Sequence, residues 1–475
     1  MPDKNHHDLI VLGGGPGGYA AAFHAADKGF NVTLIDPEEN PGGTCLYRGC
    51  IPSKAMLHAA KVISDAREAS EFGVDFAEPK IDVDKLRAWK GSVVERLTSG
   101  VGKIAEMRKV KHIRGTGSFV SNTELEVKLV DGTSERHTFD KLILATGSLA
   151  ISIPGWPMDN PRMMLAKDAL DLPEIPKTML IVGGGYIGLE LGSVYATLGT
   201  KVTVVEMMKT ILPGADKDLV RPLNKRLKQQ FEAIHLETKV SSVNALKTKV
   251  KVEFEGKGAD DARKEYDYVL VSVGRKPNSA NLGLENTNIE LDDKGFVQVD
   301  DKRRTAEANI WAIGDIAGEP MLAHKASHEG RVAVEAIAGE KSAGWDPRAI
   351  PAVVFTDPEI AWAGLMEDEA KAKGIDVQVV KFPLAASGRA ITLGRTDGLT
   401  KLVVNAKTKK ILGLGIAGPN AGDMIAEGVL AIEMGCVADD LRLSIHPHPT
   451  LSEAIMESAD LIFNQSPHYM LPKKR

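Results

Sequence analysis

Residues 8–36 read DLIVLGGGPGGYAAAFHAADKGFNVTLID: a short apolar strand, a glycine-rich turn, an alanine-rich helix and a second apolar strand. The spaced glycines are Gly13, Gly15 and Gly18, and the second strand ends at Asp36. Glycines in this G-x-G-x-x-G spacing let the backbone approach a pyrophosphate at the helix N-terminus, and the acid can accept a hydrogen bond from a ribose hydroxyl. The glycines alone would also fit a ligand-free tight turn, but the complete order of strand, turn, helix, strand and acid predicts a dinucleotide-binding unit.

Two of the three cysteines follow in residues 42–54, GGTCLYRGCIPSK. On an ideal helix the Cα atoms of Cys45 and Cys50 would lie roughly 8–9 Å apart, whereas a disulfide needs about 4.4–6.8 Å. A bridge therefore requires a tightened or non-helical backbone, which Gly49 and Pro52 would permit. Such a bridge near a helix start would be easily reduced. The alternative is two unrelated buried cysteines, and the spacing alone does not decide between the two.

The strand, glycine, helix, strand and acid order appears a second time in residues 179–206. Its glycines are Gly183, Gly185 and Gly188, and its acid is Glu206. A carboxylate at this position repels a 2′-phosphate and binds a free 2′-hydroxyl, so NAD is preferred over NADP. The repeat predicts two bound dinucleotides.

Other strands also run into glycine turns. Residues 142–148 and 268–275 have this form, and a further apolar strand ends at Asp315, which either binds a ribityl hydroxyl or caps the next helix. We expect long helices over residues 58–69 and 83–108. From residue 350 strands alternate with amphipathic helices and no third fingerprint appears, which is typical of an interface or a substrate wall.

Prolines flank His448 near the C-terminus, and Glu453 lies five residues further on. A histidine oriented by a carboxylate is the arrangement that a general base needs. The alternative is a structural histidine. The third cysteine, Cys436, has no partner in this pattern and is expected in the core.

The composition is that of an ordinary soluble protein, with 43% hydrophobic and 26% charged residues. A net charge of −5 argues against nucleic acid as a main partner, and no apolar run reaches the roughly 18–20 residues of a membrane span. The polar N-terminus shows no signal peptide or presequence, which favours a cytoplasmic location. No metal site is expected, and residues 472–475 are expected to form a solvated tail.

Together these motifs resemble the flavin-dependent disulfide oxidoreductases over nearly the whole chain. The resemblance rests on residues 42–54, both fingerprints, residues 145–148, 274–278, 314–315 and 446–453. The Ile-Pro-Ser-Lys after the second cysteine and the His-x-His-Pro-Thr form point to the lipoamide branch, since glutathione reductases typically carry Val-Pro-Lys-Lys. Tyr47 and Arg48 stand where Asn-Val is common, and Pro447 stands where Ala is usual; we expect these departures to tune the reaction rather than change it.

The resemblance implies an α/β fold with two Rossmann-like dinucleotide-binding domains and a C-terminal α+β dimerisation domain. The implied divisions are an FAD-binding domain at 1–150, an NAD-binding domain at 151–275, a central domain completing the FAD site at 276–348 and a dimerisation domain at 349–475.

It also implies two cofactors. The FAD contacts would be Gly13, Gly15, Gly18, Asp36, Gly43, Thr44, Lys54, Gly117, Thr146, Gly147, Asp315 and Ala323. The NAD contacts would be Gly183, Gly185, Gly188, Glu206, Val240, Gly274 and Arg275. Glu190 would pair with Lys54 beside the flavin, and Tyr186 matches a position that in related enzymes can cover the nicotinamide pocket.

The implied activity is oxidation of protein-bound dihydrolipoamide with NAD, through FAD and a redox pair of Cys45 and Cys50. His448, oriented by Glu453, would act as base in the active site of the other subunit of a homodimer. A lipoyl-bearing transacylase of a 2-oxo acid dehydrogenase or glycine cleavage complex would be the partner. Alternatives are a glutathione or mercuric reductase, a flavoprotein with a scaffolding role, and an NADH oxidase or peroxidase, against which the cysteine pair argues.

Overall fold

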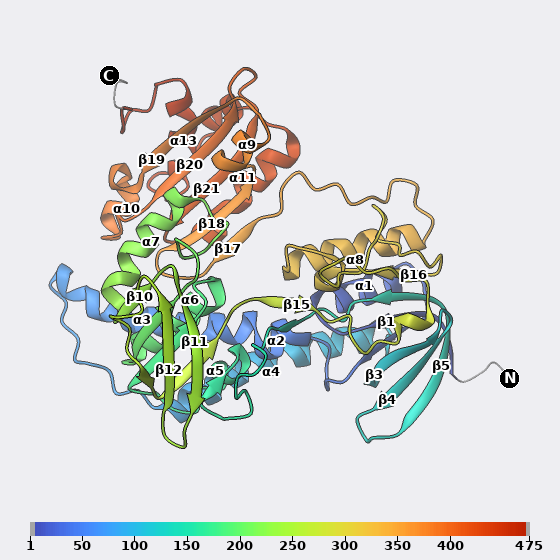
Figure 1. The fold of residues 1–475 in the computed structure, drawn as a ribbon. Coiled ribbons are helices and arrows are strands. Elements are labelled where there is room, and N and C mark those ends of the chain that lie inside the picture. Colours follow the sequence, from blue (N-terminus) through green and yellow to red (C-terminus); the bar gives the residue numbers. More distant parts are fainter. Residues whose placement is uncertain (1–4, 472–475) are drawn as a thin grey trace.

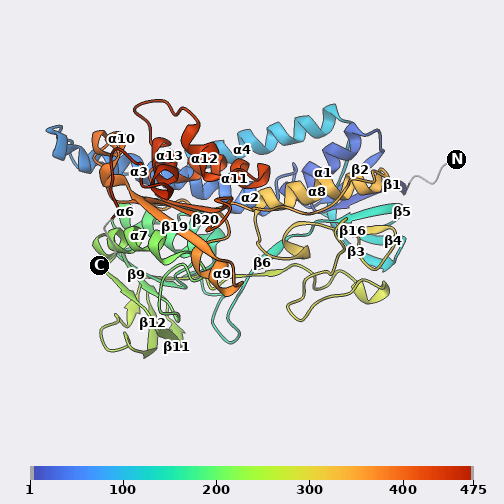
Figure 2. The ribbon, with the colours of Figure 1, turned by 90° about the horizontal axis from the view of Figure 1, so that it is seen from above.

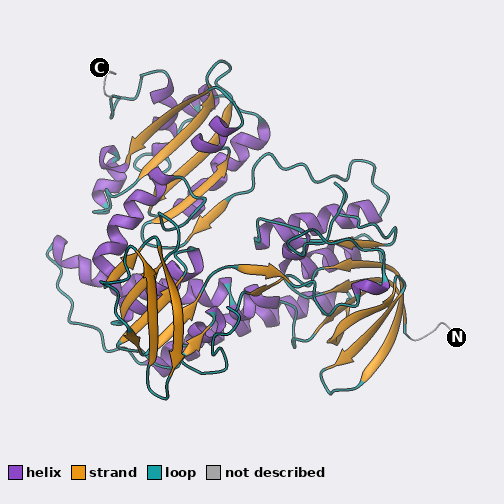
Figure 3. Ribbon diagram, viewed as in Figure 1, coloured by secondary structure: helices purple, strands orange, loops and turns teal. Residues whose placement is uncertain are grey.

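The computed structural model describes residues 5–471 and arranges them around three larger sheets and two small ones (Figures 1 and 3). The tail at 472–475, expected to be solvated, lies outside the described residues. Within residues 5–471, no helix is both long enough and apolar enough to cross a membrane.

The first sheet carries the first glycine fingerprint. Its parallel strands follow the order β3 (Lys111–Ser121), β2 (Val32–Asp36), β1 (His6–Leu12), β5 (Ser134–Leu144) and β16 (Ile310–Ala312). Strand β4 (Glu124–Leu129) pairs antiparallel with β3 and β5. Residues 9–12 of β1 are buried because both faces of the sheet are covered, as in other parallel sheets. Helices α1 (Pro16–Asp27) and α8 (Ala323–Ile337) lie side by side against it (Figures 1 and 2).

The second sheet carries the second fingerprint and repeats this parallel arrangement. Its order is β10 (Ala233–His235), β9 (Lys201–Val205), β8 (Thr178–Val182), β14 (Tyr268–Val271) and β7 (Met163–Met164). Its helices are α5 (Ala166–Asp171), α6 (Tyr186–Leu198) and α7 (Lys217–Gln230), and a small antiparallel sheet joins β11 (Thr238–Ala245), β12 (Val250–Gly256) and β13 (Glu265–Tyr266). Strands β6 (Ser148–Ala150) and β15 (Arg275–Pro277) pair antiparallel between the two fingerprint sheets (Figure 1).

The third sheet is antiparallel and belongs to the C-terminal part of the chain. Its order is β17 (Ala352–Val354), β18 (Glu359–Gly364), β21 (Ile411–Gly418), β20 (Leu399–Asn405) and β19 (Val377–Pro383). The accompanying helices are α9 (Glu367–Ala372), α10 (Gly388–Thr392), α11 (Ala421–Met434), α12 (Ala438–Leu443) and α13 (Glu453–Ile462). Cys436 is half-buried at the edge of this core rather than fully inside it, because it follows the end of α11.

Two helices meet at the cysteines. Helix α2 (Gly43–Arg48) ends at Gly49, and α3 (Cys50–Glu68) begins directly after it. The expected helix over 58–69 therefore starts eight residues earlier than the sequence indicated. Pro52 lies in the first turn of α3, where a missing N–H costs nothing because first-turn amides have no partner within the helix. The helix break is at Gly49, not at Pro52. The second expected helix is α4 (Val83–Met107).

Candidate active site

Each fingerprint turn is held by its own acid. The Gly14 N–H donates to Asp36 Oδ2 at 2.6 Å, and the Glu38 N–H donates to Oδ1 at 3.0 Å. In the second unit the Gly184 N–H donates to Glu206 Oε2 at 2.7 Å, and the Met208 N–H donates to Oε1 at 2.8 Å. Burial raises the pKa of Asp36, and the Gly14 N–H opposes that rise. A carboxylate oxygen has two lone pairs, so each acid can still accept from a ribose hydroxyl.

In the first fingerprint the outer glycines, Gly13 and Gly18, have no room for a side chain, whereas the middle glycine of each fingerprint faces open space. A Cβ on Gly13 would lie 2.3 Å from the Ala145 carbonyl oxygen, and one on Gly18 would lie 1.8 Å from that of Gly13. A Cβ on Gly15 or Gly185, the middle glycine of each fingerprint, would meet nothing within 4 Å. A tight turn with an open backbone face at a helix N-terminus is a cradle that suits a pyrophosphate.

A cleft of about 840 Å³ runs from the first fingerprint to the cysteines. Its lining brings together all but one of the residues predicted to contact FAD, namely Gly13, Gly15, Asp36, Gly43, Thr44, Lys54, Gly117, Thr146, Gly147, Asp315 and Ala323. The remaining one, Gly18, packs beneath the turn. Glu190, Arg275 and Tyr186 line the same cleft although they come from the second unit or its border. The other residues predicted for NAD are not among those that line it: Gly183, Gly185, Gly188, Glu206, Val240 and Gly274.

Cys45 and Cys50 face this cleft as free thiols, Cys45 half-buried on α2 and Cys50 exposed at the start of α3. The two are chemically unequal. The hydrogen bond between them raises the pKa of Cys45, and burial raises it further. The same hydrogen bond, together with the charge of Lys54, lowers the pKa of Cys50 to about 7. Cys50 is therefore the more acidic thiol of the pair.

Lys54 is fixed beside Cys50 by two elements that are distant in sequence. Its Nζ lies 2.8 Å from Glu190 Oε2, which confirms the predicted pair, and 4.5 Å from the centre of the Phe355 ring. Glu190 Oε1 accepts the Phe355 N–H at 2.9 Å. A nearly buried carboxylate thus joins α3, α6 and the loop before β18, and holds a cation near the thiolate.

Two residues that the sequence prediction did not assign, Ser148 and Asn278, take part in the hydrogen bonds around the turn after β5. Arg275 donates to the Ser148 hydroxyl at 2.8 Å and to its carbonyl oxygen at 2.6 Å, and the Ser148 hydroxyl donates to Asp315. Thr146 Oγ1 donates to the Asn278 carbonyl oxygen at 3.0 Å. Ser148 and Asn278 both lie inside sequence motifs recognised above, at 145–148 and 274–278. Their place in these motifs could therefore have marked them as candidate site residues.

His448 is oriented as predicted. Its Nδ1 lies 2.9 Å from Glu453 Oε1, and the other carboxylate oxygen accepts the Thr450 N–H at 2.8 Å. Although partial burial opposes the effect, the Thr450 N–H and His448 lower the pKa of Glu453. The His448 side chain is 74% exposed. Among the described residues that line the cysteine cleft, none comes from the loop at 445–453.

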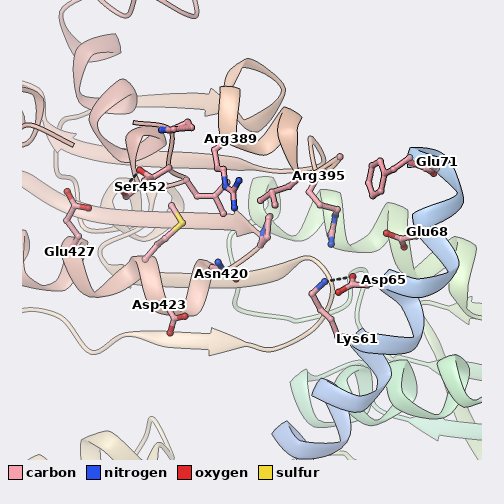
Figure 4. A pocket seen from close by; sticks show the side chains of 18 residues that line it. Lys61, Asp65, Glu68, Glu71, Arg389, Arg395, Asn420, Asp423, Glu427 and Ser452 are labelled. Carbon is pink, nitrogen blue, oxygen red and sulfur yellow. Dashed lines mark hydrogen bonds and ion pairs between the residues drawn. The ribbon is translucent and has the colours of Figure 1, made fainter. Parts of the chain in front are cut away.

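A second cavity, of about 820 Å³, lies between α3 and the C-terminal sheet (Figure 4). Lys61, Asp65 and Glu68 line it from α3, and Arg389 and Asp423 line it from the C-terminal part. Residues 449–452 form part of its wall, directly after His448. Its lining is strongly charged and includes neither cysteine of the pair, so it is a different feature from the cysteine cleft.

Comparison with known proteins places these features in context. The pattern described as "Pyridine nucleotide-disulphide oxidoreductase" matches residues 7–330, and the one described as "Pyridine nucleotide-disulphide oxidoreductase, dimerisation domain" matches residues 350–459. The chain is 48% identical to a dihydrolipoyl dehydrogenase of Vibrio cholerae over 95% of both chains, and 46% identical to that of Geobacillus stearothermophilus over 97% of both. Among solved structures, LpdA of Mycobacterium tuberculosis superposes with a TM-score of 0.88 at 27% identity, covering 95% of this chain and 99% of that one. The HOCl-induced flavoprotein disulfide reductase RclA of Escherichia coli gives 0.85 at 28%, covering 96% and 100%.

Proposed function

Because the chain belongs to the pyridine nucleotide-disulphide oxidoreductase family, we propose that it oxidises dihydrolipoyl groups on a carrier protein through Cys45 and Cys50. The observation that carries the proposal is the pair of thiols facing the cleft, with Lys54 held beside Cys50 by Glu190. Relatives with 42–48% identity over nearly the full chain bear the name dihydrolipoyl dehydrogenase, which supports this substrate over the glutathione or mercuric reductase alternative.

FAD and NAD are the cofactors of this enzyme. The open glycine cradle and the 840 Å³ cleft fit a dinucleotide at the first fingerprint, and the second fingerprint offers a matching cradle. When bound, FAD supplies two-electron transfer between the thiol pair and NAD. We assign to FAD the eleven predicted FAD contacts that line the cleft, together with Gly18. We assign to NAD the residues Gly183, Gly185, Gly188, Glu206, Val240, Gly274 and Arg275. The divisions at 1–150, 151–275, 276–348 and 349–475 are proposed as the corresponding functional units.

The match to the dimerisation domain indicates a homodimer. We propose that His448 of one subunit serves the cysteine cleft of the other, since within one chain it lies outside that cleft. A lipoyl-bearing transacylase as the docking partner and a cytoplasmic location stay proposals.

The thiol chemistry follows from the two residue pairs. His448, oriented by Glu453, takes the proton from a substrate thiol, because only the thiolate attacks a disulfide. The thiolate attacks Cys45 Sγ of the oxidised pair, so a bond between substrate sulfur and Cys45 forms and the Cys45–Cys50 bond breaks. Cys50 leaves as a thiolate, and its lowered pKa makes it a good leaving group. The second substrate thiol then attacks the first substrate sulfur, which closes the lipoyl ring and breaks the bond to Cys45. The proton of that second thiol passes to Cys45, which leaves as a thiol.

The test is the variant His448→Gln, with His446→Gln on the same loop as its matched control. Removing a general base should slow the thiol half-reaction by roughly 10²–10⁴-fold, while the half-reaction with NADH stays near the wild-type rate. His446 bonds instead to Glu427 at 2.8 Å, so its replacement should leave the thiol half-reaction much less affected. Stopped-flow traces in which both half-reactions slow equally would contradict the role of His448. Bound flavin that responds to NADPH but not to dihydrolipoamide would contradict the proposed substrate.

A further inference from the structure

A buried charged cluster lies on and next to α8, and none of its three residues lines the cysteine cleft. Glu329 on α8 is fully buried, and its carboxylate lies 3.1 Å from Lys325 Nζ and 3.0 Å from Arg303 Nη1. Lys325 is 4% exposed and Arg303 is 11% exposed. Replacing a buried ion pair by apolar side chains is often neutral or stabilising, so stability alone is weak grounds for placing three charges here.

The cluster holds one loop from behind. Glu329 Oε2 accepts the Gly314 N–H at 2.6 Å, and Lys325 Nζ donates to the carbonyl oxygens of Gly314 at 3.3 Å and Gly318 at 3.0 Å. Gly314 has φ +76°, a left-handed conformation that other residues rarely adopt. Backbone groups at both ends of the loop at 314–318 are therefore fixed by charge-assisted hydrogen bonds, which are stronger than neutral ones.

The front of the same loop belongs to the cleft. Asp315, its second residue, lines the cleft and accepts from the Ser148 hydroxyl. Ala323 and Ala326, on the helix that carries Lys325 and Glu329, also line it. Charged side chains thus fix the backbone of this loop on its buried side, while the Asp315 carboxylate faces the cleft. Such an arrangement holds the carboxylate in one position.

We propose that Lys325 and Glu329, with Arg303, are positioning residues for the flavin, which hold Asp315 in place to receive it. The inference rests on the assignment of this cleft to FAD in the proposed function. The cluster acts through Asp315 and touches no reacting atom, so its loss affects how firmly FAD is held.

The chain offers a matched control for a lysine-to-methionine change. Lys401 on β20 is fully buried and lies 2.8 Å from each of Asp216, Asp218 and Glu367, which belong to the start of α7 and to α9. Lys325→Met and Lys401→Met thus delete the same group from similarly buried ionic clusters. Both should lower the unfolding temperature of the holoenzyme.

The deciding measurement is the rate of FAD release, followed by the rise of free-flavin fluorescence after dilution of the holoenzyme. Lys325→Met should release FAD at least about tenfold faster than wild type, as expected for the loss of hydrogen bonds from a charged donor, whereas Lys401→Met should not. Equal release rates in the two variants overturn the inference. If Lys325→Met does not fold, Lys325→Arg replaces it, with Lys401→Arg as the control. Arginine keeps the positive charge but places its donors at a different distance from the backbone.

A double-mutant cycle tests whether the cluster acts through Asp315. Asp315→Asn should itself speed release, and adding Lys325→Met to it should give little further increase if the two lie on one path. If the increases in FAD release rate caused by the two substitutions multiply in the double variant, the positioning role of Lys325 is overturned. A wild-type protein without FAD would instead contradict the proposed function, which keeps the two failures distinct.

Discussion

At the scale of single residues, the thiol pair depends on one hydrogen bond. That bond is the largest contribution to the low pKa of Cys50, ahead of the charge of Lys54. We expect Cys45→Ala to raise the pKa of Cys50 above its value of about 7, because the thiolate then loses its hydrogen-bond donor. Alkylation of Cys50 by iodoacetamide, followed against pH by mass spectrometry, would measure the shift. Cys436→Ala is the matched control, and an unchanged midpoint in Cys45→Ala would mean that Lys54 alone stabilises the thiolate.

A second residue-scale prediction concerns His7, which lies 3.0 Å from His137 and 2.8 Å from Thr33 across three strands. Burial, then Lys111 and His137, lower its pKa to about 4. Above pH 6.5 the imidazole of His7 is neutral in both the folded and the unfolded chain. Between pH 6.5 and 4 only the unfolded chain binds a proton there, so the free energy of unfolding falls as the pH is lowered. The loss should reach roughly 2–3 kcal/mol near pH 4. Urea unfolding across this range should show a shallower pH slope for His7→Asn, and identical slopes would contradict the assignment.

At the scale of elements, the approach of α2 to the first fingerprint depends on Gly43. It has φ +57°, and a Cβ there would lie 2.5 Å from Gly15 Cα, a backbone atom that cannot turn aside. Gly43→Ala should therefore cost at least about 2 kcal/mol of stability and weaken FAD binding. Calorimetry and flavin content measure the two effects.

Gly91, within α4, is the matched control. No atom lies within 4 Å of the Cβ position there. Gly91→Ala should stabilise the protein by roughly 0.5–1 kcal/mol because alanine restricts the unfolded chain. Equal effects at the two glycines would show that the close approach of α2 is unimportant.

The elements also show what the sequence could predict. The fingerprint turns and their acids were predictable because strand, turn, helix and acid are neighbours along the chain. The start of α3 was not, because Pro52 reads as a helix breaker unless its place in the first turn is known. Contacts such as Ser148 with Arg275 and Asp315 join three turns that only the assembled sheets bring together, so no local pattern contains them.

At the scale of the whole molecule, buried or half-buried ion pairs link α3 and α7 to the C-terminal sheet and the loop before β18. Lys401 connects the C-terminal sheet to the start of α7, and Arg226 on α7 pairs with both Glu68 of α3 and Asp357 near β18. Along the sequence these residues look like ordinary solvated charges. Their pairing depends on how distant segments of the chain pack together, so no local pattern in the sequence predicts it.

The proposed placement of His448 at the cysteines of the other subunit has a genetic consequence. On that arrangement, homodimers of a Cys45→Ser chain and homodimers of a His448→Gln chain are both inactive, whereas a mixed dimer holds one site that neither change reaches. With random association, two such alleles expressed in one cell should restore about a quarter of wild-type activity, because about half the dimers are mixed and each has one intact site of two. Cys45→Ser paired with Cys50→Ser should restore none, since every site then lacks a cysteine. Complementation of these alleles, scored by growth or by assay of co-purified dimers, would thus count the chains that build one catalytic unit.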